Sequence, residues 1–131
     1  MKRFLTIADD LTGANDTGVQ FTKKGIPTEV AFDSRANVEA PSIVIDTESR
    51  NETPLQAYGK VKRMVETILA NQSFDLVYKK VDSTLRGNMA MEIKAIDEVY
   101  RQERILFAPA YPDNHRTTVN GVHCVEGVPL R

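Results

Sequence analysis

Short apolar runs of strand type recur along this chain, and several of them end abruptly in charged or hydroxyl residues. The first run, residues 3–8, reads Arg-Phe-Leu-Thr-Ile-Ala and stops at two aspartates. Runs of similar character follow at residues 28–32, 42–45, 74–78 and 105–108. Because buried parallel strands read as nearly continuous apolar runs, this recurrence predicts an open, mostly parallel sheet of five strands.

Helical patterns lie between these runs. Residues 14–24 end before a glycine, and residues 53–71 repeat apolar side chains at three- and four-residue spacing behind a proline. Residues 89–101 place apolar side chains on one side and Glu92 among the charged residues on the other. Such spacing is typical of helices that cover a sheet. The alternation predicts an α/β three-layer sandwich with right-handed crossovers.

The end of the chain has a different pattern. Between residues 117 and 130, Gly121 and Gly127 separate short valine-containing pieces, which favours a C-terminal β-hairpin segment. A length of 131 residues suits a single domain, here residues 1–131. The last residues carry no capping signal, so we expect this domain to be incomplete.

Charge and composition exclude several classes of partner. The chain has 17 basic and 18 acidic residues and a net charge of −1, which gives no global field for nucleic acid or acidic membranes. No run approaches the roughly 20 apolar residues that cross a bilayer. Cys124 is the only cysteine, and the N-terminus lacks a signal-peptide pattern. We therefore expect a cytoplasmic protein that binds neither nucleic acid nor membrane.

Four loops are expected to gather where the strands end. In open parallel sheets, ligands bind outside the carboxyl ends of the strands. The loops at that edge would be residues 9–13, 46–50, 79–88 and 109–118, and each is rich in charged or hydroxyl side chains. This agreement predicts a site for a polar small molecule.

The first loop carries two adjacent carboxylates, Asp9 and Asp10. Carboxylates held this close need a cation, donors from a ligand or a raised pKa, and one of them could accept a proton from a sugar hydroxyl. Alternatively, one of the two merely caps the helix that begins near Gly13 while the other is solvated.

A second cluster follows the fourth strand and combines cations, hydroxyls and a flexible backbone. An arginine fork and a lysine point charge together suit a sugar-acid carboxylate or a phosphate, although Asp-Ser-Thr before a helix is also an ordinary cap. The members of this cluster are Lys80, Asp82, Ser83, Thr84, Arg86 and Gly87.

Three further residues could extend the site. Asp46 and Arg50 follow the third strand, where one could accept from hydroxyls and the other could pair with an anion. The alternative for these two residues is a surface ion pair of little energetic weight. Arg116, which follows a proline-rich turn, is another candidate anion ligand.

No metal site is expected in this chain. His115, His123 and Cys124 invite a metal interpretation, but neighbouring strand residues point to opposite faces and no four-ligand spacing exists. The glycine signatures of phosphate loops are also absent, so an ATP site is not visible in these residues.

Taken together and in this order, the motifs resemble the four-carbon acid sugar kinase family, long catalogued only as a domain of unknown function. The residues that carry the resemblance are 7–14, 46–50, 78–88, 109–112 and 116–118, and they span nearly the whole chain. The resemblance implies an ATP-dependent kinase that phosphorylates threonate, erythronate or 3-oxo-tetronate on the terminal hydroxyl. It also implies that a leading domain binds the sugar acid and that a trailing domain, absent from this chain, binds ATP and Mg²⁺.

Carried onto this sequence, the resemblance assigns roles to the clustered residues. Asp9 and Asp10 would lie at the sugar hydroxyls, one of them acting as base, and Arg50 and the cluster after the fourth strand would bind the substrate's carboxylate and hydroxyls. The family pattern usually has glycine where His115 stands. The chain alone is expected to be inactive as a kinase.

Two other functional classes remain open from the residues. One is a non-catalytic binding remnant. The other is a receiver-like phosphoacceptor module, since an acidic pair, Asp46 and a later lysine superficially match that arrangement. An exposed apolar face would also favour homo-oligomers.

Overall fold

The computed structural model describes residues 1–35 and 38–130, so the expected domain end at Arg131 lies outside the described residues. Over the first hundred residues the order of strands and helices is the one that the sequence predicts, with no described helix between the strands at residues 28–31 and 42–46. A run of short strands follows. In chain order the elements are β1 (Phe4–Ala8), α1 (Leu11–Lys23), β2 (Thr28–Ala31), β3 (Ser42–Asp46), α2 (Pro54–Asn71), β4 (Leu76–Lys79), α3 (Met89–Val99), the 3₁₀ turn η1 (Pro112–Asn114), β5 (Arg116–Val119), β6 (Val122–Val125) and β7 (Val128–Pro129).

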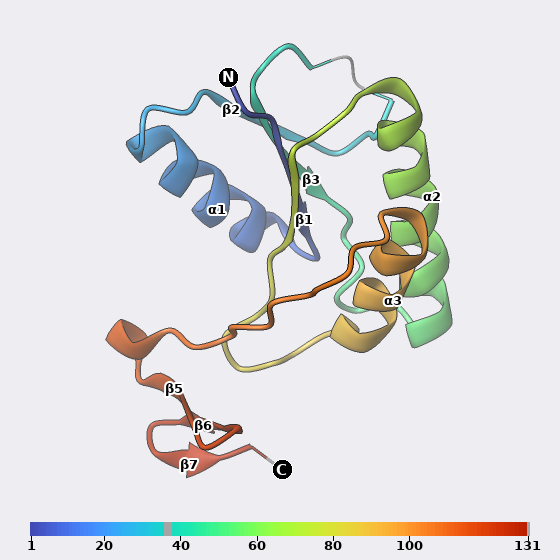
Figure 1. Cartoon of the computed structure of the whole chain (residues 1–131). Helices are drawn as coiled ribbons and strands as arrows, with labels where there is room; N and C mark the ends of the chain where they lie inside the picture. Colours follow the sequence, from blue (N-terminus) through green and yellow to red (C-terminus); the bar gives the residue numbers. More distant parts are fainter. Residues whose placement is uncertain (36–37, 131) are drawn as a thin grey trace.

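The first four strands form one parallel sheet in the order β2-β3-β1-β4. Helix α1 covers one face of this sheet, and α2 and α3 cover the other (Figure 1). The predicted α/β three-layer architecture is therefore confirmed. The chain leaves β1 toward one side of the sheet and leaves β3 toward the other, so β1 and β3 flank the point at which the strand order reverses.

Alternation along the central strands builds the core. One face of β1 and β3 packs on α2 and α3, and its fully buried side chains include Leu5, Ile7, Ile43 and Ile45. The opposite face is thinner, since Ala8 and Val44 pack against Ala14 of α1. Successive residues of a strand point to opposite faces of the sheet. Because helices cover both faces, the side chains on both sides of these strands must be apolar.

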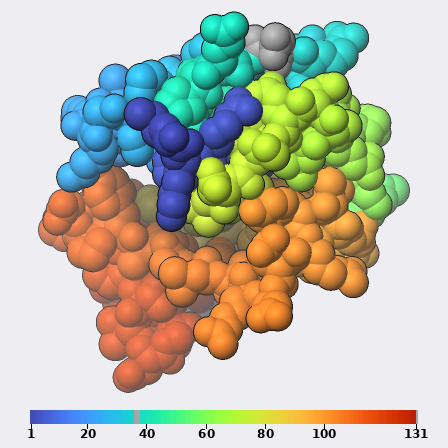
Figure 2. Space-filling view, turned by 45° about the horizontal axis from the view of Figure 1, so that its top comes forward, coloured from blue at the N-terminus to red at the C-terminus, as the bar shows by residue number. Residues whose placement is uncertain are grey.

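The expected fifth strand at residues 105–108 is wrong. This segment pairs with no described strand, and Ile105 is 59% exposed and Leu106 92% exposed. Together with β4 and α3, it bounds a cavity of about 770 Å³, seen as a hollow between the yellow-green and orange atoms in Figure 2. An apolar run specifies a strand only where a neighbouring backbone accepts its hydrogen bonds, and β4 does not do so here.

The expected solvent position of Glu92 is also wrong. Its side chain is fully buried beneath the turn that follows β3, where it meets Ser49 and Lys79. Helical periodicity placed Glu92 beside the exposed acids of α3, but α3 leans its first turn toward the sheet's carboxyl edge.

The predicted C-terminal hairpin segment is confirmed. Strands β5, β6 and β7 form a small antiparallel sheet, which stands apart from the helices on the side where the chain passes from β4 to α3 (Figure 1). Over the described residues, no helix has both the length and the apolar character required to span a membrane.

Candidate functional site

The carboxyl ends of three strands bring the predicted loops together. In the sheet register, Ala8 lies opposite Asp46 and Ile7 lies opposite Lys79. The chain therefore leaves β1, β3 and β4 at neighbouring points of one edge. The first three predicted loops meet there. The fourth, residues 109–118, is not preceded by a strand of this sheet.

Arg50 is the centre of this edge. Its Nε donates to Asp9 Oδ2 over 3.0 Å and its Nη2 to Asp9 Oδ1 over 3.0 Å, which is a bidentate pair. Its Nη1 donates to Asp10 Oδ2 over 2.8 Å, and Nη2 lies 3.9 Å from Asp82 Oδ1. One guanidinium therefore binds both adjacent aspartates and reaches the loop after β4.

Asp10 caps α1 and also binds a cation. Its Oδ1 accepts the backbone N–H of Gly13 over 3.0 Å, which caps α1, while its Oδ2 accepts from Arg50. Asp9 is not the solvated partner of that alternative, since it is only 2% exposed. The cap explains why α1 begins at Leu11, a few residues before the expected start.

Asp82 organises the loop after β4. Its Oδ2 accepts from the backbone N–H and the hydroxyl of Thr84, and its two oxygens accept a bidentate pair from Arg86, each bond 3.0 Å long. Burial opposes ionisation of this carboxyl, but the hydrogen bonds from Arg86 and Thr84 prevail and lower the pKa of Asp82 well below its usual range. Asp82 is therefore ionised at neutral pH.

Two glycines allow the loops to approach each other closely. A Cβ at Gly87, whose φ is +94°, would lie 2.7 Å from Asp9 Oδ2. A Cβ at Gly13 would lie 2.7 Å from Asp10 Oδ1 and 3.0 Å from Lys80 Nζ, so Lys80 and Asp10 flank the start of α1. Among the described residues, Lys80 Nζ has no hydrogen-bond or ion-pair partner, which leaves this cation available at the edge.

Asp46 departs from its expected role. The alternative of a surface ion pair with Arg50 is wrong, because Asp46 is 2% exposed and Arg50 binds the other aspartates. Asp46 Oδ1 accepts the N–H of Glu48 over 3.0 Å, and Oδ2 is buried without a described partner. Burial raises the pKa of Asp46 to about 6, and the nearby carboxylates of Glu48 and Asp10 add to this effect.

Asn88 also contributes to the site, although the sequence analysis included it only as the last residue of the loop after the fourth strand. Its side chain does not cap α3. Instead, its Nδ2 donates to the carbonyl of Ser49 over 3.0 Å and to that of Glu52 over 2.9 Å, so it fastens the loop after β4 to the turn that carries Arg50. The signal was its place directly after Gly87 in the recognised motif.

The structure does not join Arg116 to this cluster. Arg116 lies in β5, and its guanidinium donates to the carbonyl of Asn114. Across the described chain, no contact links it to the aspartates or to Arg50. His115 adopts the left-handed conformation, φ +57°, which fits the glycine usual there in the resembled family.

Ser83 connects the site to the small sheet. Its carbonyl accepts from His123 Nε2 over 2.7 Å, and His123 Nδ1 lies 2.8 Å from the hydroxyl of Thr118. Because a carbonyl oxygen can only accept, His123 Nε2 is the donor to Ser83.

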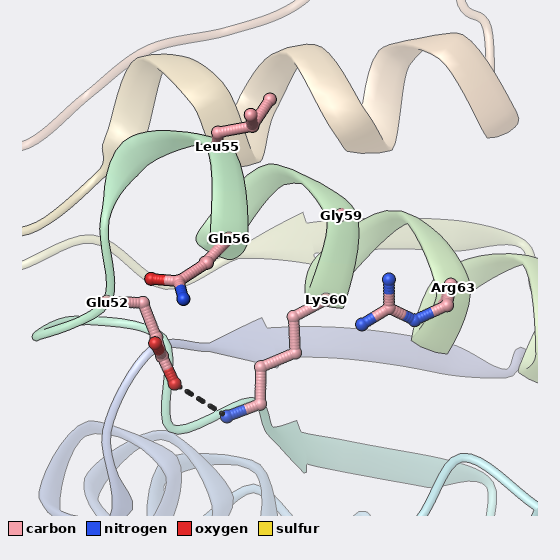
Figure 3. Close-up of a pocket in the computed structure, with 6 residues that line it drawn as sticks. All are labelled: Glu52, Leu55, Gln56, Gly59, Lys60 and Arg63. Carbon is pink, nitrogen blue, oxygen red and sulfur yellow. Dashed lines mark ion pairs between the residues drawn. The ribbon is translucent and has the colours of Figure 1, made fainter.

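A second hollow lies along the outer face of α2, lined by Glu52, Leu55, Gln56, Gly59, Lys60 and Arg63 (Figure 3). None of the predicted site residues lines it. Within the described ranges, no group of three or more His, Cys, Asp or Glu residues is arranged to hold a metal ion.

The chain matches a known class of sugar-binding domain. Residues 4–131 match the family model described as a sugar-binding N-terminal domain, and the chain belongs to this family.

The curated relatives are kinases of four-carbon sugar acids. The chain is 41% identical over 130 residues to a D-threonate kinase of Salmonella typhimurium, covering 98% of this chain and 31% of the relative. It is 37% identical over 136 residues to a D-erythronate kinase of Heliobacterium modesticaldum, covering 99% of this chain and 31% of that relative. A 3-oxo-tetronate kinase of Methylobacterium radiotolerans is 30% identical, with 95% and 31% covered. The chain thus spans about a third of their length.

Solved structures show the same fold. A protein of unknown function from Bordetella bronchiseptica, determined with bound citrate as a domain-swapped dimer, superposes with a TM-score of 0.88 at 34% identity. The match covers 96% of this chain and 33% of that one. A Salmonella typhimurium protein described as a putative tRNA synthase superposes with a TM-score of 0.85 at 26% identity, covering 98% and 33%.

Proposed function

We propose that this chain is the substrate-binding part of an ATP-dependent kinase that phosphorylates threonate, erythronate or 3-oxo-tetronate on the terminal hydroxyl. The observation that carries the proposal is the interlocked edge in which Arg50 binds Asp9 and Asp10 and approaches Asp82. Membership of a sugar-binding family and the names of the relatives support the ligand class.

Cations of the edge would take the carboxylate of the sugar acid. Lys80 Nζ is unpartnered among the described residues, and the side chain of Arg86 is 67% exposed although it binds Asp82. The carboxylates of Asp9 and Asp10 would accept hydrogen bonds from the sugar hydroxyls. Such a division separates an anion end from a hydroxyl end and therefore orients the ligand. The citrate bound to the Bordetella protein supports a carboxylate ligand.

The proton of the reacting hydroxyl would pass to Asp9 or Asp10. Phosphoryl transfer depends on positioning and charge neutralisation, and Mg²⁺ would supply part of that neutralisation. We assign ATP and Mg²⁺ to residues of the full-length kinase outside these 131 residues, and the reaction to the cytoplasm. The swapped dimer of the Bordetella protein supports self-association of the chain as part of the same proposal.

Calorimetric titration of the chain tests this function. We expect D-threonate or D-erythronate to bind, and the polyols threitol and erythritol, which lack the carboxylate, to bind about tenfold more weakly or not at all. Lys80→Gln and Arg86→Gln should each weaken binding of the acids, while Arg63→Gln on α2 should not. With ATP and Mg²⁺ added, the chain alone should form no phosphorylated product. Equal affinity for acids and polyols, or turnover by the chain alone, would contradict the proposal.

A further inference from the structure

A carboxylate that the proposed reaction does not use lies beneath the site. Glu92 of α3 is fully buried. Its Oε1 accepts the hydroxyl of Ser49 over 2.5 Å, and its Oε2 lies 2.9 Å from Lys79 Nζ. The Ser49 hydroxyl is also 2.7 Å from that of Thr47. A single side chain of α3 thus binds both the turn after β3 and the end of β4.

Burial of this charge pair is costly. Removing two ions from water carries a desolvation penalty that their mutual attraction often fails to repay, and apolar side chains of similar size commonly serve stability as well or better. Helix α3 already places Ala95 and Ile96 in the core. A gain in stability is therefore a weak explanation for a buried carboxylate at position 92. A better explanation is that Glu92 fixes the positions of Ser49 and Lys79.

The two partners of Glu92 each precede a cation of the site. Ser49 is followed by Arg50, and Lys79 is followed by Lys80. Because successive residues of extended backbone point to opposite faces, a Lys79 side chain held toward α3 directs Lys80 the other way, toward the start of α1. Lys80 Nζ does lie beside Gly13.

Further bonds complete the hold on the Arg50 turn. The N–H groups of Ser49 and Arg50 both donate to the carbonyl of Asp9, over 3.1 and 3.2 Å. Asn88 holds the carbonyl of Ser49 from the opposite side. Glu92 supplies the side-chain contact that secures Ser49 from below.

We propose that Glu92 is a positioning residue of the acid-sugar site, which fixes the turn at residues 47–50 and the end of β4 so that Arg50 and Lys80 face the ligand. This inference rests on the proposed function for the identity of the ligand. Its effect on Arg50 does not depend on any ligand and can be measured separately.

The first experiment observes Arg50 without ligand. In a ¹⁵N–¹H spectrum of the chain, the Arg50 Nε–H held by Asp9 should give a slowly exchanging side-chain signal. Glu92→Gln should abolish that signal or speed its exchange about tenfold or more, because the Ser49 anchor is weakened. The matched control on the same helix is Glu98→Gln, which removes an ion pair with Lys62 and should leave the signal unchanged. An unchanged signal in Glu92→Gln overturns the proposal.

The second experiment measures affinity for D-threonate and D-erythronate in a double-mutant cycle. Glu92→Gln should weaken binding about tenfold, and the loss should be much smaller in an Arg50→Lys background if Glu92 acts through Arg50. A purely structural role predicts losses that add, and additive losses overturn the proposal. If Glu92→Gln fails to fold, Ser49→Ala, which keeps the Glu92–Lys79 pair, replaces it in both experiments. A wild-type chain that binds no four-carbon acid contradicts the proposed function, and the Arg50 signal then decides the positioning claim.

Discussion

Asp9 and Arg50 leave no room for a side chain at position 87. Gly87 combines a φ of +94°, which L-residues rarely adopt, with a Cβ position 2.7 Å from Asp9 Oδ2. Asp9 cannot easily move away, because Arg50 binds both of its oxygens. At this scale, close backbone approach sets the geometry of the site as much as charge does.

Substitution of Gly87 separates the cost of a side chain at positive φ from the cost of a clash with Asp9. Gly25 has a similar φ of +77° with nothing within 4 Å of its Cβ position, so Gly25→Ala measures the backbone cost alone. We expect Gly87→Ala to lower the free energy of unfolding by at least about 1 kcal/mol more than Gly25→Ala does, because it adds a clash. Urea denaturation of both variants measures the difference. Equal losses of unfolding free energy in the two variants would show that Asp9 moves aside without a measurable cost.

Asp46 should make stability depend on pH. Burial raises its pKa in the folded state to about 6 from an ordinary value of 3.8, so the folded state binds more protons than the unfolded state between these values. Stability contributed by the protonated carboxyl is therefore lost as pH rises toward and through about 6.

Asp46→Asn should remove this dependence, since the amide does not ionise. Relative to the wild type, we expect the stability of the variant to rise between pH 5 and pH 7.5 by about 1 kcal/mol, because the Asp46 carboxyl of the folded wild type ionises over this range. Urea denaturation across that range, with Asp75→Asn as an exposed control, measures the trend. A constant difference between wild type and Asp46→Asn would contradict it.

At the scale of elements, strands form only where a partner backbone lies in register. β1 has partners on both sides, β3 and β4, and four of its five residues are buried. Residues 105–108 have the composition of a strand but no described pairing, and their apolar side chains face the cavity beside β4 or the solvent. The same apolar pattern therefore forms a paired strand at β1 and a segment without a described pairing at residues 105–108.

Substitution of Leu106 tests whether residues 105–108 are packed as a strand. Because its side chain is 92% exposed, Leu106→Ser should change the free energy of unfolding by less than about 0.5 kcal/mol. Leu5→Ala, in the fully buried part of β1, should cost about 2 to 5 kcal/mol under the same conditions. Both values come from urea denaturation. A loss above about 2 kcal/mol at Leu106 would indicate that the segment is packed as a strand in solution.

At the scale of the whole molecule, the two sheets are connected at the site. The small sheet touches the loop after β4 through His123, whose Nε2 donates to the Ser83 carbonyl. That loop also carries Asp82 and Arg86, so the C-terminal strands support the loop after β4 without supplying a described contact to the charged edge.

Removal of this link should loosen the loop and spare the main sheet. We expect His123→Ala to speed amide hydrogen exchange about fivefold or more at residues 83–87, with no change in β1 and β3, because one buried hydrogen bond is lost. His115→Gly is the control, since glycine suits the left-handed conformation there. Exchange mass spectrometry measures both variants. Unchanged amide exchange at residues 83–87 in His123→Ala would show that the loop stays ordered without the hydrogen bond from His123.

The local chemistry of the sequence accounts for much of this structure. Apolar runs and helical spacing predicted four of the five expected strands of the main sheet and all three helices, because these patterns reflect which face of each element is buried. The same reasoning predicted the loops that meet at the carboxyl edge. The charged residues of those loops could be nominated from their types alone, as Asp9, Arg50 and Asp82 were.

The tertiary structure decided what depends on distant partners. Whether residues 105–108 pair, whether Glu92 is buried and whether Arg116 reaches the charged edge are set by segments far away in the chain, and no local periodicity encodes their positions. Asp10 illustrates both levels. Its capping of α1 follows from its place before a helix, while its bond to Arg50 exists only because the parallel register brings the ends of β1 and β3 together.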